Sequence, residues 1–423
     1  MPKPNHLRRN TFALLISNSG GALLSFGLSV LIGRALGEDG LGVYATALAW
    51  AFPISMVADF GLGTLITRDV AQEPDSETAY LRSVVSARVV IGGGSMLILW
   101  LAAPFVSGNV AVVQAIQISA PLVLILPFFG VFTAIFRARQ AMWPIPWLNM
   151  GMLVVQVVLT TLVFLAGGGV AGALVVNTLT STGQLIVAYG MYQRWFVVKQ
   201  PRAAAIRQPS PADYTRALLK RAWPFALAAI LAALQARLGI ILLEQLSDTH
   251  EVGLYAAASR FVEAGRMIPN AIFGALLPAL VSLTARPAAV DRLFSRATLG
   301  LSVLSGTTGL VLILLATPLL ITTFGEDFQP ATPVLQIGAL ALLPALLRGL
   351  RTLYWYALGQ EQFVNRITAG TLILQIILMF QLIPQFGALG VVIATPIVES
   401  VGLILLWFSV GTRSKSRDRT ETT

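Results

Sequence analysis

The chain has 423 residues, of which 56% are hydrophobic and only 11% are charged, whereas soluble domains carry about 25% charged residues. It has no cysteine, which excludes disulfides and thiolate chemistry, and no lysine follows a glycine-rich loop, so a Walker A motif is absent and no cofactor is expected. The net charge of +10 is therefore interpreted as the positive-inside bias of a membrane protein, with no nucleic acid as partner.

Apolar runs of membrane-spanning length recur along the whole chain after a short basic tail at 1–10. Each run is near the ~20 residues that cross a bilayer as a helix, and the first is too long for a signal peptide. The sequence thus predicts an all-α integral membrane protein with twelve transmembrane helices, at 11–33, 41–62, 84–107, 110–135, 144–166, 170–192, 222–246, 252–283, 297–322, 331–353, 365–384 and 387–410.

The basic residues predict the topology. With both termini in the cytoplasm, only Arg34 falls outside, and Arg237, Arg260 and Arg266 fall within the membrane. All other lysines and arginines then lie on the cytoplasmic side, a set that includes Arg88, Arg348 and Arg351. We therefore expect a multi-pass protein of the cytoplasmic (inner) membrane with cytoplasmic N and C termini.

The two halves of the chain resemble each other. Residues 41–45 match 252–256 at an offset of 211, and residues 155–159 match 374–378 at 219. An even number of helices per half makes the repeats parallel, with a substrate site expected between them near the midplane. The predicted domains are a six-helix bundle at 1–192, a basic cytoplasmic linker at 193–221, a second six-helix bundle at 222–410 and a cytoplasmic tail at 411–423.

Four charged residues lie deep in two adjacent predicted helices. Arg237 and Arg260 are equally far from the turn near residue 248, about 17 Å along their helices, and Glu263 and Arg266 follow Arg260 at i+3 and i+6. Buried charges in a bilayer are costly and mark functional sites. One interpretation is a self-neutralised triad with Arg237 reaching the lipid boundary. The other is a cationic site that binds an anionic substrate through Arg237, Arg260, Arg266 and Glu263.

Three further charges are candidates with weaker support. Arg34 lies just outside the first span, where it either reaches the lipid boundary or contributes to the outer mouth of a substrate cavity. Asp59 lies near the inner end of the second span and is interpreted chiefly as an interfacial, capping or ion-paired carboxylate, with coupling of transport to an ion gradient as the alternative. Glu399 lies near mid-membrane, and the sequence leaves open whether it couples transport to a proton or sodium gradient or pairs with a buried arginine.

Motifs in the first 75 residues resemble a known family. These are 31–37 (LIGRALG), 40–44 (GLGVY), 58–62 (ADFGL) and Thr67-Arg68, which look like the opening of bacterial Wzx-type O-antigen and exopolysaccharide flippases. The resemblance implies a V-shaped transporter with a fold like that of multidrug/oligosaccharidyl-lipid/polysaccharide exporters. It also implies transport of undecaprenyl-diphosphate-linked oligosaccharide to the outer leaflet, with cavity arginines holding the diphosphate. Partners would include a polysaccharide polymerase and chain-length machinery.

Two other functions compete with this interpretation. A membrane polysaccharide polymerase or ligase would need a large outer loop for its chemistry, but every outer connection here is short, so an enzyme is not expected. An ion-coupled multidrug antiporter of the same superfamily would offer carboxylates to cationic substrates. Three arginines set against Glu263 and Glu399 favour an anion instead.

Overall fold

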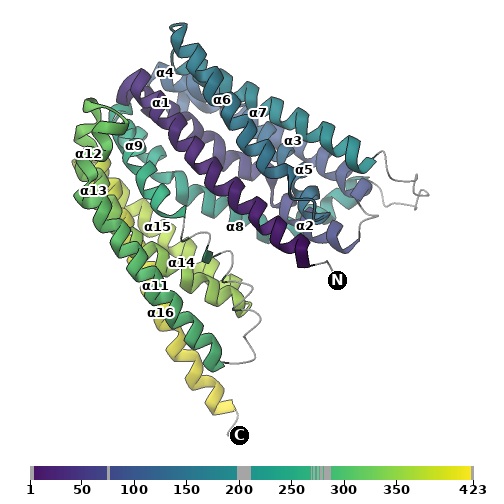
Figure 1. Ribbon diagram of the computed structural model, residues 1–423. Coiled ribbons are helices and arrows are strands. Elements are labelled where there is room, and N and C mark those ends of the chain that lie inside the picture. Colours follow the sequence, from purple (N-terminus) through teal and green to yellow (C-terminus); the bar gives the residue numbers. More distant parts are fainter. Residues whose placement is uncertain are drawn as a thin grey trace. The chain divides into compact units, whose positions relative to one another are not determined.

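The protein folds as two compact helical units, Met1–Ile241 and Leu242–Thr423 (Figure 1). The computed structural model describes residues 4–73, 77–197, 211–267 and 287–420, together with residues 269, 272, 273, 276 and 280. Every regular element in these ranges is a helix, which confirms the predicted all-α class. Residues 198–210 of the predicted linker lie outside the described residues, and the predicted domain bounds stay a prediction.

Unit 1 contains all of the helices that carry the family-like motifs. Its elements are α1 (Pro4–Asp59), α2 (Leu62–Gln72), α3 (Glu77–Val106), α4 (Val110–Ser119), α5 (Leu122–Ala138), α6 (Pro144–Leu165), α7 (Val170–Tyr192), η2 (Gln193–Val197) and most of α8 (Pro211–Leu246). Two expected spans merge into α1, which kinks at Gly37, where φ is 67° and ψ is −170°. Glycine adopts this conformation readily because it has no Cβ.

The short helix α2 was not expected from the sequence. Gly61, with φ of 67°, separates it from α1 and approaches α8 so closely that a Cβ there would lie 2.6 Å from the Ala226 nitrogen. The apolar face of α2, with Leu62, Leu65 and Ile66, packs into a hydrophobic core cluster of unit 1. This packing places the polar face of α2 beside the first turn of α3 and beside α8.

Unit 2, like unit 1, is built mainly of long helices. Its elements are the end of α8, α9 (Thr249–Gly265), α11 (Pro287–Leu314), α12 (Ala316–Thr323), η3 (Glu326–Ala331), α13 (Thr332–Leu340), α14 (Leu342–Ala357), α15 (Glu361–Phe386) and α16 (Ala388–Thr420). The helix expected over 252–283 is interrupted by a turn at Arg266. The chain reverses between α15 and α16 at Gly387, where the Glu251 carboxylate accepts a hydrogen bond of 2.7 Å from the Ala388 N–H. An acidic side chain at a helix N-terminus is stabilising because it satisfies a backbone donor and complements the helix dipole.

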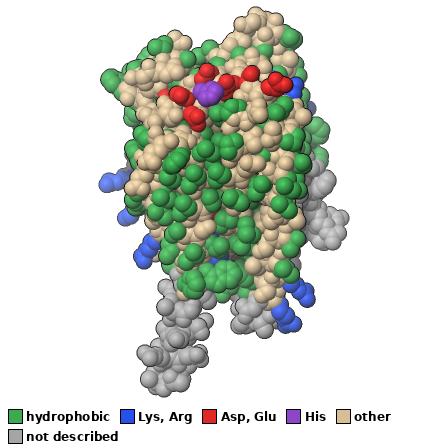
Figure 2. Space-filling view, turned by 90° about the vertical axis from the view of Figure 1, so that its left-hand side faces the viewer, with side chains coloured by type: hydrophobic (Ala, Val, Ile, Leu, Met, Phe, Trp, Pro, Cys, Tyr) green, Lys and Arg blue, Asp and Glu red, His purple; other side chains and the backbone are tan. Residues whose placement is uncertain are grey.

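Ten segments of the described chain are long and apolar enough to cross a membrane. The first, Gly20–Asp59, covers two of the expected spans, and α9 belongs to an expected span whose second half is only partly described. The expected count of twelve is consistent with this arrangement. Figure 2 shows hydrophobic side chains covering most of one face, acidic side chains gathered near one end, and most of the visible basic side chains nearer the other.

Candidate substrate site

Arg237 lies on α8 and contacts an aromatic ring within unit 1. Its guanidinium carbon lies 5.5 Å from the centroid of the Phe52 ring on α1. A cation–π contact stabilises an arginine without neutralising its charge. Phe52 is also the residue that the internal repeat aligns with Glu263, so the same repeat position carries an aromatic ring in one unit and a carboxylate in the other.

Arg260 and Glu263 form the local ion pair that their i,i+3 spacing permits. Arg260 Nη1 lies 2.9 Å from Glu263 Oε2, and the two side chains are 24% and 52% exposed. Such a pair on a helix surface stabilises by only about 0.2–0.5 kcal/mol. Arg266 stands at the C-cap of α9, and its Nε is buried without a hydrogen-bond partner among the described residues. Arg260 and Glu263 of the expected triad therefore form a pair, whereas Arg266 follows them at the end of α9.

The position of Arg266 depends on the glycine before it. A Cβ at Gly265 would lie 3.1 Å from the Thr308 methyl group on α11, so the end of α9 packs closely on that helix. The Arg266 N–H bonds the Glu263 carbonyl at 3.1 Å, as in a tightened last helical turn. The fold therefore brings Arg260, Glu263 and Arg266 to the last two turns of α9, instead of the middle of a longer helix.

Glu399 is paired with a buried arginine, one of the two roles that the sequence left open. Arg348 Nη1 on α14 lies 3.0 Å from Glu399 Oε2 on α16, and Arg348 Nη2 donates to Thr371 Oγ1 on α15 at 3.1 Å. Gly402 permits this arrangement, because a Cβ there would lie 2.8 Å from Arg348 Nε. One guanidinium thus links three helices of unit 2.

Asp59 has an equivalent partner in unit 1. Arg88 on α3 donates to Asp59 Oδ1 and to the Pro127 carbonyl on α5, and the Arg88 side chain is 0% exposed. Asp59 is therefore ion-paired, which is one of the roles that the sequence left open for it. Arg34, the remaining candidate, is exposed on α1.

Arg88, Arg348 and Arg351 are buried arginines that the sequence did not single out, because the topology count included them among the cytoplasmic charges. All three are buried within their units. Arg351 lies within 5.1 Å of the ring centroids of Phe294, Tyr354 and Trp407. Sequence reasoning missed them because each lies near an expected helix end. Their positions inside apolar runs were the signal that could have identified them.

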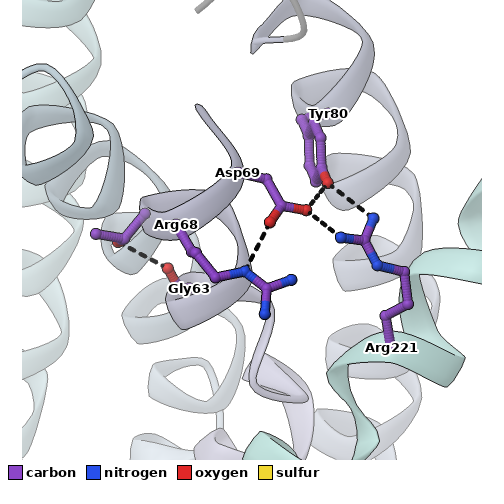
Figure 3. Close-up of polar contacts among 6 residues, drawn as sticks. Gly63, Arg68, Asp69, Tyr80 and Arg221 are labelled. Atoms are coloured by element: carbon purple, nitrogen blue, oxygen red, sulfur yellow. Dashed lines mark hydrogen bonds and ion pairs between the residues drawn. The ribbon is translucent and has the colours of Figure 1, made fainter. Parts of the chain in front are cut away.

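A second polar cluster in unit 1 was also missed (Figure 3). Asp69 on α2 accepts hydrogen bonds from Tyr80 on α3, from Arg68 Nε at 2.9 Å and from Arg221 Nη2 on α8 at 2.8 Å. Burial raises the pKa of Asp69, but the hydrogen bonds from Tyr80 and Arg68 and the charge of Arg221 outweigh it, so its pKa is lowered from 3.8. The cluster ties α8 to α2 and α3.

Comparisons with known proteins identify the family and the fold. The family model described as polysaccharide biosynthesis protein matches residues 7–284, and no curated protein sequence matches the chain. The solved structure of the lipid II flippase MurJ in an inward closed conformation is similar, with a TM-score of 0.77, 15% identity and coverage of 94% of this chain and 87% of that one.

Two further solved structures have the same fold. An inward-facing multidrug resistance MATE family transporter of the MOP superfamily has a TM-score of 0.76 at 14% identity, covering 96% of this chain and 99% of its own. A MOP superfamily transporter from Pyrococcus furiosus, described as having a binding pocket of reversed polarity, has a TM-score of 0.64 at 14% identity, covering 96% and 95%. With a family match over more than half of its length and this helical fold, the chain belongs to the polysaccharide biosynthesis protein family and folds like MurJ and the MATE transporters.

Proposed function

We propose that this protein is a flippase that moves undecaprenyl-diphosphate-linked oligosaccharide from the inner to the outer leaflet of the cytoplasmic membrane by alternating access. The family match, the apolar helices and the fold shared with a lipid II flippase support this proposal. The glycan would serve O-antigen or exopolysaccharide export, and a polymerase and chain-length machinery would act on it after transport. Both termini would be cytoplasmic, with the acidic end in Figure 2 outside.

The observation that carries the proposal is the difference between the arginine pairs. Arg88 and Arg348 are buried against carboxylates on other helices, and breaking such pairs costs about 3–5 kcal/mol. Among the described residues, Arg260 pairs only with Glu263, whose side chain is 52% exposed, and a pair of this kind contributes about one tenth of that energy. Arg260 can therefore exchange its partner for a substrate anion at little cost, whereas Arg88 and Arg348 cannot.

A diphosphate is the anion that suits this arrangement. Its desolvation inside a membrane must be offset by opposite charge and hydrogen-bond donors, and the planar guanidinium offers five donors and grips two phosphate oxygens together. In the proposal, Arg260 and Arg237 hold the diphosphate, Arg266 receives it, and Arg34 contacts the glycan-bearing headgroup at the outer mouth. Glu263 competes with the phosphate for Arg260 and so limits the affinity of the empty site.

Complementation of a flippase-deficient strain tests the arginine site. Arg260→Ala and Arg237→Ala each remove hydrogen bonds to a charged group worth about 1.5–3 kcal/mol apiece, so export should fall at least roughly tenfold. Lysine at either position restores the charge without the planar fork and should rescue only partly. Arg296→Ala, at an exposed position on α11, is the matched control and should export normally. Full export by the Arg237→Ala, Arg260→Ala double variant, with normal membrane levels, would contradict the proposal.

The drug-antiporter alternative is supported by the MATE neighbours. Its expected carboxylates would be Asp59 and Glu399, but both are paired with arginines, so we assign them to helix packing instead of coupling to a proton or sodium gradient. Drug susceptibility distinguishes the two functions. If overproduction raises resistance to cationic drugs and Glu399→Gln abolishes that resistance without loss of protein, the antiporter function is correct.

A further inference from the structure

A polar cavity lies inside unit 1, at residues that the proposed arginine site does not use. Its volume is about 340 Å³, near the lower end of the roughly 300–1,000 Å³ typical of small-molecule sites. It is lined by residues of α1, α6 and α7: Gly21, Asn149, Met152, Leu153, Gln156, Thr180, Ser181 and Gln184. Five of the eight carry amides or hydroxyls, and none carries a charge.

The polar groups lie deep within the two helices. The helices α6 and α7 are antiparallel neighbours joined by the turn at 166–169, and both are candidate membrane spans. Gln156 and Thr180 lie about 14 and 15 Å along their helices from that turn. Asn149 and Gln184 lie about 24 and 21 Å from it, and the Gln184 amide donates to Asn149 Oδ1 at 2.9 Å.

Helix packing explains only part of this arrangement. The bond between Gln184 and Asn149 joins two helices, as polar side chains commonly do in membranes, and Thr180 bonds the carbonyl of Val176 within its own helix at 2.8 Å. Gln156 is different, because its side chain is only 7% exposed, lines the cavity and has no hydrogen bond to any described residue. The amide is open to the cavity and can form hydrogen bonds with a group that enters it, and leaving such an amide without a partner would cost about 1–3 kcal/mol.

The chemistry of the lining selects the class of ligand. A phosphate or a cation would need an opposite charge, which the eight lining residues do not supply. Amides and hydroxyls both donate and accept hydrogen bonds, which matches the hydroxyl groups of a neutral sugar. Met152 and Leu153 add apolar surface for the carbon–hydrogen face of a sugar ring. We propose that this cavity binds a sugar residue of the transported glycan, with Gln156 as its principal hydrogen-bonding group.

This inference rests on the proposed function for the source of the sugar, but it concerns separate residues and is tested separately. The protein is reconstituted in lipid nanodiscs and titrated with three probes. They are a short-chain polyprenyl diphosphate, a panel of the same lipid carrying single neutral sugars such as N-acetylglucosamine, galactose and rhamnose, and the matching free sugars. The sugar-free lipid reports the arginine site alone, and the free sugars report the cavity alone.

The wild type should bind at least one glycosylated lipid more tightly than the sugar-free lipid. Gln156→Leu keeps the approximate size of the side chain, removes its hydrogen bonds and should lower that preference by about three- to tenfold. It should leave affinity for the sugar-free lipid unchanged. Thr161→Val, which alters a hydroxyl on the same helix that does not line the cavity, should change neither affinity.

Each outcome separates the two proposals. The cavity proposal is overturned if the wild type prefers no glycosylated lipid and binds no free sugar, or if Gln156→Leu retains the full preference. Loss of sugar-free lipid binding in Arg260→Ala, together with an unchanged sugar preference in Gln156→Leu, would support the arginine site and refute the cavity. Sugar binding that depends on Gln156, with no diphosphate binding by the wild type, would support the cavity and refute the arginine site.

Discussion

The buried pair of Arg348 and Glu399 gives a prediction whose magnitude follows from its surroundings. Arg348 and Glu399 side chains are only 11% and 19% exposed, and Arg348 also donates to Thr371. Arg348→Leu leaves the Glu399 carboxylate without its counter-charge, so we expect unfolding to become about 3–5 kcal/mol easier. Glu399→Gln keeps an acceptor for Arg348 but removes the charge, and about 1–3 kcal/mol should be lost.

The double variant Arg348→Leu, Glu399→Leu distinguishes a lost pair from a disturbed core. Replacement of both partners by apolar side chains removes the desolvation cost together with the attraction, so stability should recover most of the loss caused by Arg348→Leu alone. The free energy of unfolding is measured by denaturant titration of the purified protein in detergent. A coupling energy of 1 kcal/mol or more in the double-mutant cycle is expected for contacting residues, taking about 0.5–3 kcal/mol as the usual range.

Two results would refute this reasoning. Strictly additive losses in the cycle would mean that the two side chains do not interact. Normal stability of Glu399→Gln combined with loss of transport and of its ion dependence would assign Glu399 to coupling, the role that the buried pair argues against.

Three other predictions concern the rest of the chain. Because the pKa of Asp69 is lowered in the folded state, its carboxylate stabilises the fold above the unfolded-state pKa, and this contribution disappears as the pH falls through the folded-state pKa. The difference in stability between wild type and Asp69→Asn should therefore shrink on acidification from about pH 5 towards pH 2. A constant difference would contradict the role assigned to Asp69. Gly61→Ala should destabilise the protein by about 1–3 kcal/mol in denaturant titration, because φ at this residue is 67° and a Cβ would meet the Ala226 backbone. Gly63→Ala is the control and should cost less, because a Cβ there would have only ordinary contacts, none closer than 3.5 Å. Equal losses of stability in the two variants would refute the steric argument. Ala205→Cys should react with a membrane-impermeant thiol reagent only after the cells are opened, because the linker is expected in the cytoplasm. The chain has no native cysteine that would add background labelling. Labelling of intact cells would mean that the predicted topology is inverted.

The membrane spans of this chain are visible in its sequence, whereas the interruptions of its helices are not. Spans were found because a bilayer requires about 20 apolar residues in a row, a property that depends only on neighbours along the chain. Helix interruptions were harder to find. The kink at Gly37 falls between two expected spans, but the turn at Arg266 falls inside one, and nothing in the local composition distinguishes Gly265 from other glycines of apolar helices. Its close packing on α11 is a property of the fold.

The charged residues show the same division. Arg260 and Glu263 are three residues apart, so helical geometry alone predicted their contact, and the structure confirms it. The partners of Arg88 and Arg348 lie 29 and 51 residues away, and Asp69 and Arg221 are separated by 152. Sequence determined that this chain is a helical membrane protein with arginines inside its apolar runs. Only the tertiary structure decided which of those arginines are buried against carboxylates of other helices and which has a weak partner, because the depth and rotation of each helix are set by packing against helices distant in the chain.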